Sequence, residues 1–160
     1  SLGGVVAIAM CHADEKRCAS LILADTFAVH PDGQAIYDRS LGASNDLRSA
    51  AEARVDILIA QPADSAVRSE VVETMARISP AAYRIGAEAV WLADQRDRAA
   101  EIELPTLVIC GTEDKVTPPA LSEELTRLIP GAQLKLIVGA GHIGNLEKPT
   151  EFNAIVEGFI

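Results

Sequence analysis

The chain has 160 residues, of which 49% are hydrophobic and 23% are charged, and its formal net charge is −9. This length and composition predict a folded domain with its own hydrophobic core and argue against a disordered chain. The acidic charge argues against nucleic acid and membrane surfaces as partners, because both are bound through basic patches. No apolar run approaches the roughly 20 residues of a membrane-spanning helix.

The cysteines are odd in number and lack the spacing of a metal site; they are Cys11, Cys18 and Cys110. Cys11 and Cys110 lie within apolar runs, which predicts buried and reduced thiols. We therefore expect a cytoplasmic protein with no disulfide, no metal and no organic cofactor.

Residues 1–30 are expected to form one part of an α/β core. The run 5–11 is apolar on every side, which predicts a helix buried all round beneath a sheet. The run 21–24 is short and continuously apolar, as in a central parallel strand that is covered on both faces. A helix followed by a strand is one turn of an α/β winding.

Residues 31–98 differ in character and are expected to form an all-helical cap. Four helix-like segments succeed one another with no convincing strand between them. Apolar residues recur at helical spacing in 64–78 and in 80–92, and Pro62 and Pro80 lie near the expected helix starts. A helical stretch inserted between α/β segments is typical of a lid that excludes water from a pocket.

Residues 99–160 return to alternating strands and helices, and we expect them to complete the α/β core. The runs 106–110 and 134–138 predict two further strands, each followed by glycine. Thr117 and Pro118 have the types of an N-cap and a first helical residue, so they predict the start of a helix.

Ser1 is the candidate nucleophile. It opens the run Ser1-Leu-Gly-Gly directly before the first predicted helix, where glycines allow a tight turn and close packing on a sheet. On a sharp strand-to-helix turn the serine hydroxyl is exposed, and the backbone N–H of Leu2 would point at an oxyanion. The alternatives for Ser1 are a helix N-cap or simply the end of a fragment.

Asp114 and His142 each follow a predicted strand in a loop marked by glycine. A carboxylate there can hold an imidazole in one tautomer and stabilise its charged form. Glu113 is the nearest rival for the acid, whereas His12 and His30 lack the strand and glycine setting of His142. A turn-forming aspartate and a surface histidine are the alternatives. The order Ser, Asp, His at separate strand ends predicts a catalytic triad.

Together these motifs resemble those of the α/β-hydrolase fold family. The run 1–4 resembles the second half of its nucleophile elbow, 104–114 resembles its acid-bearing strand and loop, and 139–149 resembles its histidine loop. Within the family, 23–26 and 75–102 are most similar to 3-oxoadipate enol-lactonases and related small esterases. The resemblance implies a mostly parallel sheet flanked by helices, and hydrolysis of an ester or lactone through an acyl-enzyme.

The sequence departs from the family pattern at its start. The early strands, the first half of the elbow and the second oxyanion donor are missing, and the remaining strands would expose a sheet edge. We therefore expect this chain to be the C-terminal piece of the fold, working with a companion chain that ends before Ser1. A nick would produce this start, and so would self-cleavage, in which the Ser1 hydroxyl attacks the preceding carbonyl.

The expected activity is that of a serine hydrolase acting on an ester or lactone of a small carboxylic acid. On the same scaffold an amidase or aminopeptidase, a carbon–carbon bond hydrolase and an acyltransferase stay open, as does a ligand receptor without catalysis. Tyr83 and Trp91 are candidates for substrate contact, with positions in the cap core as the alternative. An anionic substrate such as an enol-lactone diacid would require arginine nearby, and Arg68 and Arg84 are the candidates.

Overall fold

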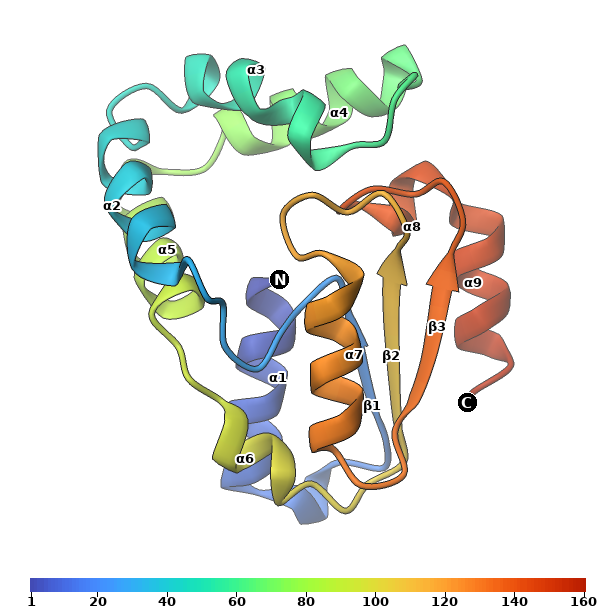
Figure 1. Cartoon of the computed structure of the whole chain (residues 1–160). Coiled ribbons are helices and arrows are strands. Elements are labelled where there is room, and N and C mark those ends of the chain that lie inside the picture. The colour runs from blue at the N-terminus through green and yellow to red at the C-terminus, as the bar shows by residue number, and fades with distance from the viewer.

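A parallel β-sheet forms the centre of the molecule in the computed structural model, which describes residues 1–160 (Figure 1). Its strands are β1 (Leu21–Ala24), β2 (Thr106–Gly111) and β3 (Gln133–Ile137), in the order β1-β2-β3. Both neighbouring pairs are parallel. The three apolar runs of the sequence match these strands to within one residue, and the α/β class with a parallel sheet is confirmed.

Helices connect the strands and make up most of the remaining chain. Their bounds are α1 Leu2–Ala13, a 3₁₀ turn Glu15–Arg17, α2 Gly33–Ala43, α3 Leu47–Leu58, α4 Ser65–Ala76, α5 Pro80–Trp91, α6 Arg96–Ala100, α7 Pro119–Leu128, α8 Gly144–Glu147 and α9 Pro149–Glu157. None of these helices combines the length and the apolarity that crossing a membrane requires.

Helices cover both faces of the sheet. On the face of α1, α6 and α7, the side chains of Ile8, Leu23, Val108 and Leu125 are fully buried. On the other face α9 packs Phe152 and its apolar neighbours against β2 and β3. Every position of β2 is buried, because this strand is covered on both sides. Each buried Leu or Ile contributes roughly 1.5–3 kcal/mol by leaving water.

The prediction that the first helix is buried all round is wrong. In α1 the residues Val5, Ile8 and Cys11 face the core, whereas Val6 is 43% exposed and Met10 is 66% exposed. Residues three apart share one side of a helix, and only that side packs on the sheet. The other stripe of α1 therefore lies at the surface of this chain.

The helix after β2 begins one residue later than the sequence predicts. Pro118 is the N-cap of α7 and Pro119 is its first residue, a position that tolerates the missing N–H of proline. Thr117 does not cap the helix, because its N–H and its hydroxyl both donate to the carboxylate of Asp114. The residue expected to start a helix is thus part of the candidate site.

Helices α2 to α5 stand apart from the sheet: α3 and α4 lie above the carboxyl ends of its strands, and α2 and α5 lie to one side, with α5 next to the start of α1 (Figure 1). The chain leaves the core at Val29 and returns at Asp94, and these two residues form an isolated antiparallel bridge. Beside the bridge, the ring of Phe27 stacks on Trp91 with centroids 5.8 Å apart. This narrow neck ties the helical segment to the end of β1.

Candidate active site

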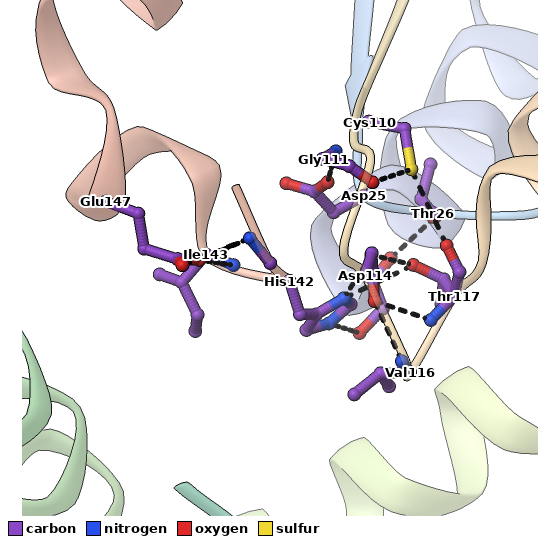
Figure 2. A network of polar contacts seen from close by, with 12 residues as sticks. Asp25, Thr26, Cys110, Gly111, Asp114, Val116, Thr117, His142, Ile143 and Glu147 are labelled. Carbon is purple, nitrogen blue, oxygen red and sulfur yellow. Dashed lines mark hydrogen bonds and ion pairs between the residues drawn. The ribbon is translucent and has the colours of Figure 1, made fainter. Parts of the chain in front are cut away.

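Side chains from three separate parts of the chain meet at the carboxyl ends of the strands (Figure 2). Ser1 precedes α1, Asp114 follows β2 and His142 follows β3. The carboxyl ends of parallel strands lie at one edge of a sheet, where α/β proteins usually bind their ligands. The structure therefore brings together the three residues that the sequence singles out for catalysis.

Ser1 lies at the N-cap of α1, held against the end of β1. Its carbonyl oxygen accepts a hydrogen bond of 2.8 Å from Thr26 Oγ1. Gly4 permits this approach, because a Cβ there would lie 2.4 Å from the Thr26 side chain, whereas a Cβ on Gly3 would meet nothing. The Ser1 side chain makes no capping bond to α1, so its hydroxyl is available to other partners.

Leu2 is the first residue of α1. Its backbone N–H has no acceptor within the helix, as is general for the first turn. The helix dipole adds partial positive charge at this end. The Leu2 N–H is therefore suited to hydrogen-bond an anion that forms next to Ser1.

Asp114 is 3% exposed, and its carboxylate is fully engaged. Its Oδ1 accepts from Val116 N at 2.8 Å and from Thr117 N at 2.9 Å, and its Oδ2 accepts from Thr117 Oγ1 at 2.7 Å. Burial acts to raise the pKa of Asp114, but donors from His142 and Thr117 outweigh it and lower the pKa below its ordinary value. Asp114 is ionised at neutral pH, whereas its rival Glu113 is exposed to solvent.

His142 connects the other two residues of the site. Its Nδ1 lies 2.9 Å from Asp114 Oδ2, and its Nε2 lies 3.3 Å from Ser1 Oγ. An ionised carboxylate only accepts hydrogen bonds, so Nδ1 carries the proton and the lone pair of Nε2 faces the serine hydroxyl. The ring is 8% exposed, which keeps it largely out of water. An imidazole in this position can take the Ser1 proton.

Glu147, the last residue of α8, holds the backbone on both sides of His142 (Figure 2). Its carboxylate accepts from Gly141 N at 3.0 Å, from Ile143 N at 3.2 Å and from Ala60 N at 2.7 Å. Hydrogen bonds to an ionised acceptor are shorter and stronger than neutral ones. Sequence reasoning missed Glu147 because its partners are backbone groups, one of them 87 residues away.

The histidine loop also lies directly against the end of α3. The His142 N–H donates to Leu58 O at 2.8 Å. Gly141 makes this contact possible, because a Cβ there would lie 2.7 Å from Ala60 N. The position of His142 thus depends on the helical segment as well as on the sheet.

A second buried carboxylate, Asp25, lies beside the acid loop, which is the segment 112–118 between β2 and α7. It follows β1, is 5% exposed and has a φ of 48°, in the left-handed region that few residues other than glycine adopt. Its Oδ1 accepts the N–H of Gly111 at 3.1 Å (Figure 2). Burial raises the pKa of Asp25 to about 7 in spite of this bond, and the nearby charge of Asp114 adds to the rise. Sequence reasoning did not single out Asp25.

Asp25, Cys110 and Asp114 place potential ligand atoms within 4.8 Å of one another. Cys110 is a buried free thiol, as is Cys11, in agreement with the sequence. Burial raises the pKa of the Cys110 thiol to about 12, so it stays protonated at neutral pH. Because metals bind the thiolate and Asp114 is already bound to His142, these residues are a poor donor set for a cation.

Of the aromatic candidates for substrate contact, Trp91 and Tyr83 are placed differently. Trp91 packs in the core beside Phe27 and also lines a cavity between the helical segment and the acid loop. Tyr83 lies outside the lining of that cavity, and its hydroxyl accepts a long hydrogen bond of 3.4 Å from Arg54.

The two arginine candidates have partners within the helical segment. Arg68 pairs with Asp56 at 3.4 Å, and Arg84 donates to Ser44 Oγ at 2.8 Å. Neither arginine lines the cavity that Trp91 faces. Their contact with a substrate stays a prediction.

The sequence of this chain is similar to those of known hydrolases. A family model described as the α/β hydrolase fold matches residues 1–149. A pimeloyl-[acyl-carrier protein] methyl ester esterase of Neisseria meningitidis serogroup C is 27% identical over 171 residues, which cover 100% of this chain and 67% of the esterase. The 3-oxoadipate enol-lactonase 1 of Acinetobacter baylyi is 31% identical over 91 residues, which cover 57% of this chain and 34% of the lactonase.

Solved structures with a similar fold include an enol-lactonase and an esterase. The enol-lactonase from Burkholderia xenovorans LB400 has a TM-score of 0.90 and 26% identity, covering 99% of this chain and 62% of the lactonase. A thermophilic esterase from Thermogutta terrifontis has a TM-score of 0.86 and 25% identity, covering 99% of this chain and 61% of the esterase. The chain thus spans 61 to 67% of the length of the methyl ester esterase and of these two structures.

Proposed function

This chain belongs to the α/β-hydrolase fold family, and from that membership we propose that it carries the catalytic triad of a serine hydrolase. The observation that carries the proposal is a series of two contacts. Ser1 Oγ lies 3.3 Å from His142 Nε2, and His142 Nδ1 lies 2.9 Å from Asp114 Oδ2. The proposed substrate is an ester or lactone of a small carboxylic acid, in line with the names of the similar methyl ester esterase and enol-lactonase.

In the first step, His142 Nε2 takes the hydroxyl proton as Ser1 Oγ attacks the carbonyl carbon of the substrate. Asp114 holds the ring with its proton on Nδ1 and stabilises the imidazolium that forms. The Leu2 N–H donates to the developing oxyanion, and one such donor is typically worth ~10²–10³ in rate. His142 then gives its Nε2 proton to the leaving oxygen, and an acyl ester remains on Ser1.

Water completes the reaction: it replaces Ser1 as the nucleophile, and Ser1 Oγ becomes the leaving group. His142 Nε2 takes a proton from water, the resulting hydroxide attacks the acyl carbon, and the carboxylic acid leaves as Ser1 Oγ regains its proton. Neither half of the reaction changes an oxidation state, so proton transfer and nucleophilic attack by these residues and water are sufficient. Asp114 keeps one charge state throughout, which fits its lowered pKa.

We also propose that helices α2 to α5 form a cap over the site, with residues 31–98 as the cap and 1–30 and 99–160 as the core. The neck between Val29 and Asp94 supports this division. The contact of the histidine loop with the end of α3 supports it as well, because Leu58 accepts the N–H of the candidate base and Ala60 donates to Glu147. A cap in this position would limit the access of water to an acyl-enzyme.

A companion segment is proposed to supply further strands to the sheet. The relatives are longer than this chain, β1 pairs with a strand on one side only, and α1 carries an exposed apolar stripe. Self-cleavage before Ser1 stays a prediction. If the serine cuts its own chain, Ser1→Ala protein will have the mass of an uncut precursor, and equal cutting in both proteins excludes it.

Labelling with a fluorophosphonate probe tests the proposed nucleophile. In the intact protein that contains this chain, we expect the probe on the Ser1 peptide of the wild type and no label in Ser1→Ala. His142→Ala is expected to label more slowly by a factor of about 100 or more. A folded wild type that takes up no label would overturn the proposal and favour a ligand receptor.

A substrate panel separates the reactions that the scaffold allows. We expect methyl esters and lactones of small carboxylic acids to be cleaved faster than the matching amides. Hydrolysis without transfer to added alcohol or amine acceptors is expected as well. Faster cleavage of the amides, or acyl transfer in place of hydrolysis, would contradict the ester or lactone assignment.

A further inference from the structure

A cavity of about 610 Å³ lies beside the loop after Asp114, and Lys115, Val116 and Pro118 of that loop are among its lining residues. Helices α2 and α3 form one wall, and the loop after Asp114 together with the start of α7 forms the other. Seven of its fourteen lining residues are hydrophobic, among them Ile36, Trp91 and Leu121, so the body of a ligand there would be apolar. Neither Ser1, His142 nor Asp114 lines this cavity.

Three cations from distant parts of the chain line the same cavity. Arg39 comes from α2, Arg54 from α3 and Lys115 from the acid loop. None of the three forms an ion pair, and the side chain of Arg54 has only the long contact of 3.4 Å with Tyr83. The chain has 23 acidic residues against 14 Lys and Arg, so unpaired cations gathered around one cavity run against its overall charge.

The lining contains one carboxylate, that of Asp32, which leaves an excess of positive charge. Arg54 is half-buried, and its guanidinium offers a planar pair of donors that fits a carboxylate side-on. The apolar lining disfavours a small, fully hydrated anion such as free phosphate, because such an ion leaves the hydrophobic wall uncovered.

We propose that this cavity binds an organic carboxylate with an apolar chain or ring, its charge held by Arg39, Arg54 and Lys115. The site is separate from the proposed hydrolase chemistry, since neither Ser1, Asp114 nor His142 lines it, and Val116 is where the two adjoin. The N–H of Val116 donates to Asp114 Oδ1, while the same residue lines the cavity. Binding here does not require Ser1 to be reactive.

Calorimetric titration of the intact protein with octanoate tests the proposal. We expect octanoate to bind with one site per chain, and octanamide, which has the same length and no charge, to bind at least tenfold more weakly. The double variant Arg39→Gln/Arg54→Gln is expected to weaken octanoate binding by about tenfold or more. Ser1→Ala is expected to bind octanoate as the wild type does, which separates this site from the hydrolase proposal.

Two further variants keep the test decisive. Lys115 is exposed, so Lys115→Gln should fold normally and still weaken octanoate binding by a few-fold. Arg96→Gln removes a cation that pairs with Asp94 outside the cavity, and it is expected to change nothing. Equal affinity for octanoate and octanamide, or octanoate binding unaffected by both Lys115→Gln and the double variant, would overturn the proposal.

Discussion

Asp114 and Asp25 occupy similar places at the ends of neighbouring strands, yet their pKa values move in opposite directions. They are 3% and 5% exposed, so burial acts on both in the same sense and raises the pKa. Asp114 overcomes burial because the ring of His142 and two groups of Thr117 donate to it, and its pKa falls. Asp25 receives the N–H of Gly111, but burial outweighs this bond, and its pKa rises to about 7.

The difference shows that partners decide which carboxylate carries charge at this edge of the sheet. Two ionised carboxylates side by side repel each other, and the charge of Asp114 indeed contributes to the raised pKa of Asp25. The carboxylate beside the imidazole is the one that stays ionised. In this arrangement Asp25 links the end of β1 to the end of β2 while Asp114 serves the histidine.

The largest effect is expected when the charge of Asp114, and not that of Asp25, is removed. Asp114→Asn keeps the shape of the side chain but no longer stabilises the imidazolium, and its amide favours the wrong tautomer of His142. By analogy with other triads, kcat for ester hydrolysis is expected to fall by about 10⁴-fold. Asp25→Asn is the matched control, with an expected loss of no more than about tenfold. Similar losses in the two variants would mean that both carboxylates serve the imidazole.

Glu147 extends the comparison to a carboxylate whose donors are all backbone amides. Glu147→Gln retains one carbonyl oxygen and loses the charge, so the backbone on the two sides of His142 is held less firmly. We expect kcat to fall by ~10–100-fold with little change in KM, because displacing a catalytic group by about 1 Å has an effect of this size. Glu151→Gln, an exposed neighbour in α9, is the control. Unchanged kcat in Glu147→Gln would show that the loop keeps its position without this carboxylate.

The sequence was sufficient to predict the strands and to single out Ser1, Asp114 and His142, which the fold brings into contact, because both predictions depend on local signals. A continuous apolar run predicts a covered strand, and Asp114 and His142 each lie in the loop directly after such a run, where α/β hydrolases carry their acid and histidine. Asp25 and Glu147 were missed because backbone groups distant in the sequence define their roles. The exposed stripe of α1 was missed because an apolar run does not show which of its sides packs.

The cations of the cavity are a further example of what sequence reasoning misses. Arg39, Arg54 and Lys115 lie in three different parts of the chain and come to line one cavity only in the folded protein. The sequence instead suggests Arg68 and Arg84, and in the fold these have partners in Asp56 and Ser44. Charge at a position can be read from the sequence, but whether a neighbour neutralises it cannot.

The pH dependence of stability sharpens the comparison of the two aspartates. Folded protein keeps the Asp25 proton up to about pH 7, whereas an ordinary aspartate loses it near pH 3.8. Between these values unfolding releases a proton, so the free energy of unfolding should fall as pH rises, by at most ~1.4 kcal/mol per pH unit. Urea unfolding between pH 4 and 7, roughly the interval set by these pKa values, measures this slope.

Asp25→Asn should flatten that slope, because asparagine has no proton to release. Asp114 acts in the opposite sense: its pKa is lowered, so the stability it contributes is present above about pH 4 and is lost at lower pH. A slope between pH 4 and 7 that is the same in the wild type and in Asp25→Asn would show that Asp25 is ionised in the folded protein.

The smallest expected effect concerns Thr117, whose hydroxyl distinguishes the surroundings of Asp114 from those of Asp25. The hydroxyl has one proton, which it donates to Asp114 Oδ2 at 2.7 Å, so its contact of 3.2 Å with His142 Nδ1 adds little. Thr117→Val removes one neutral donor, worth about 0.5–1.5 kcal/mol, and leaves the donation from His142 in place. We expect kcat to fall by only about two- to fivefold, with Thr117→Ser close to the wild type. As pH is lowered, the free energy of unfolding of Thr117→Val should begin to fall at a higher pH than that of the wild type, because the pKa of Asp114 rises when a donor is removed. A loss of kcat as large as that of Asp114→Asn would mean that the hydroxyl, and not the imidazole alone, keeps Asp114 in its working state.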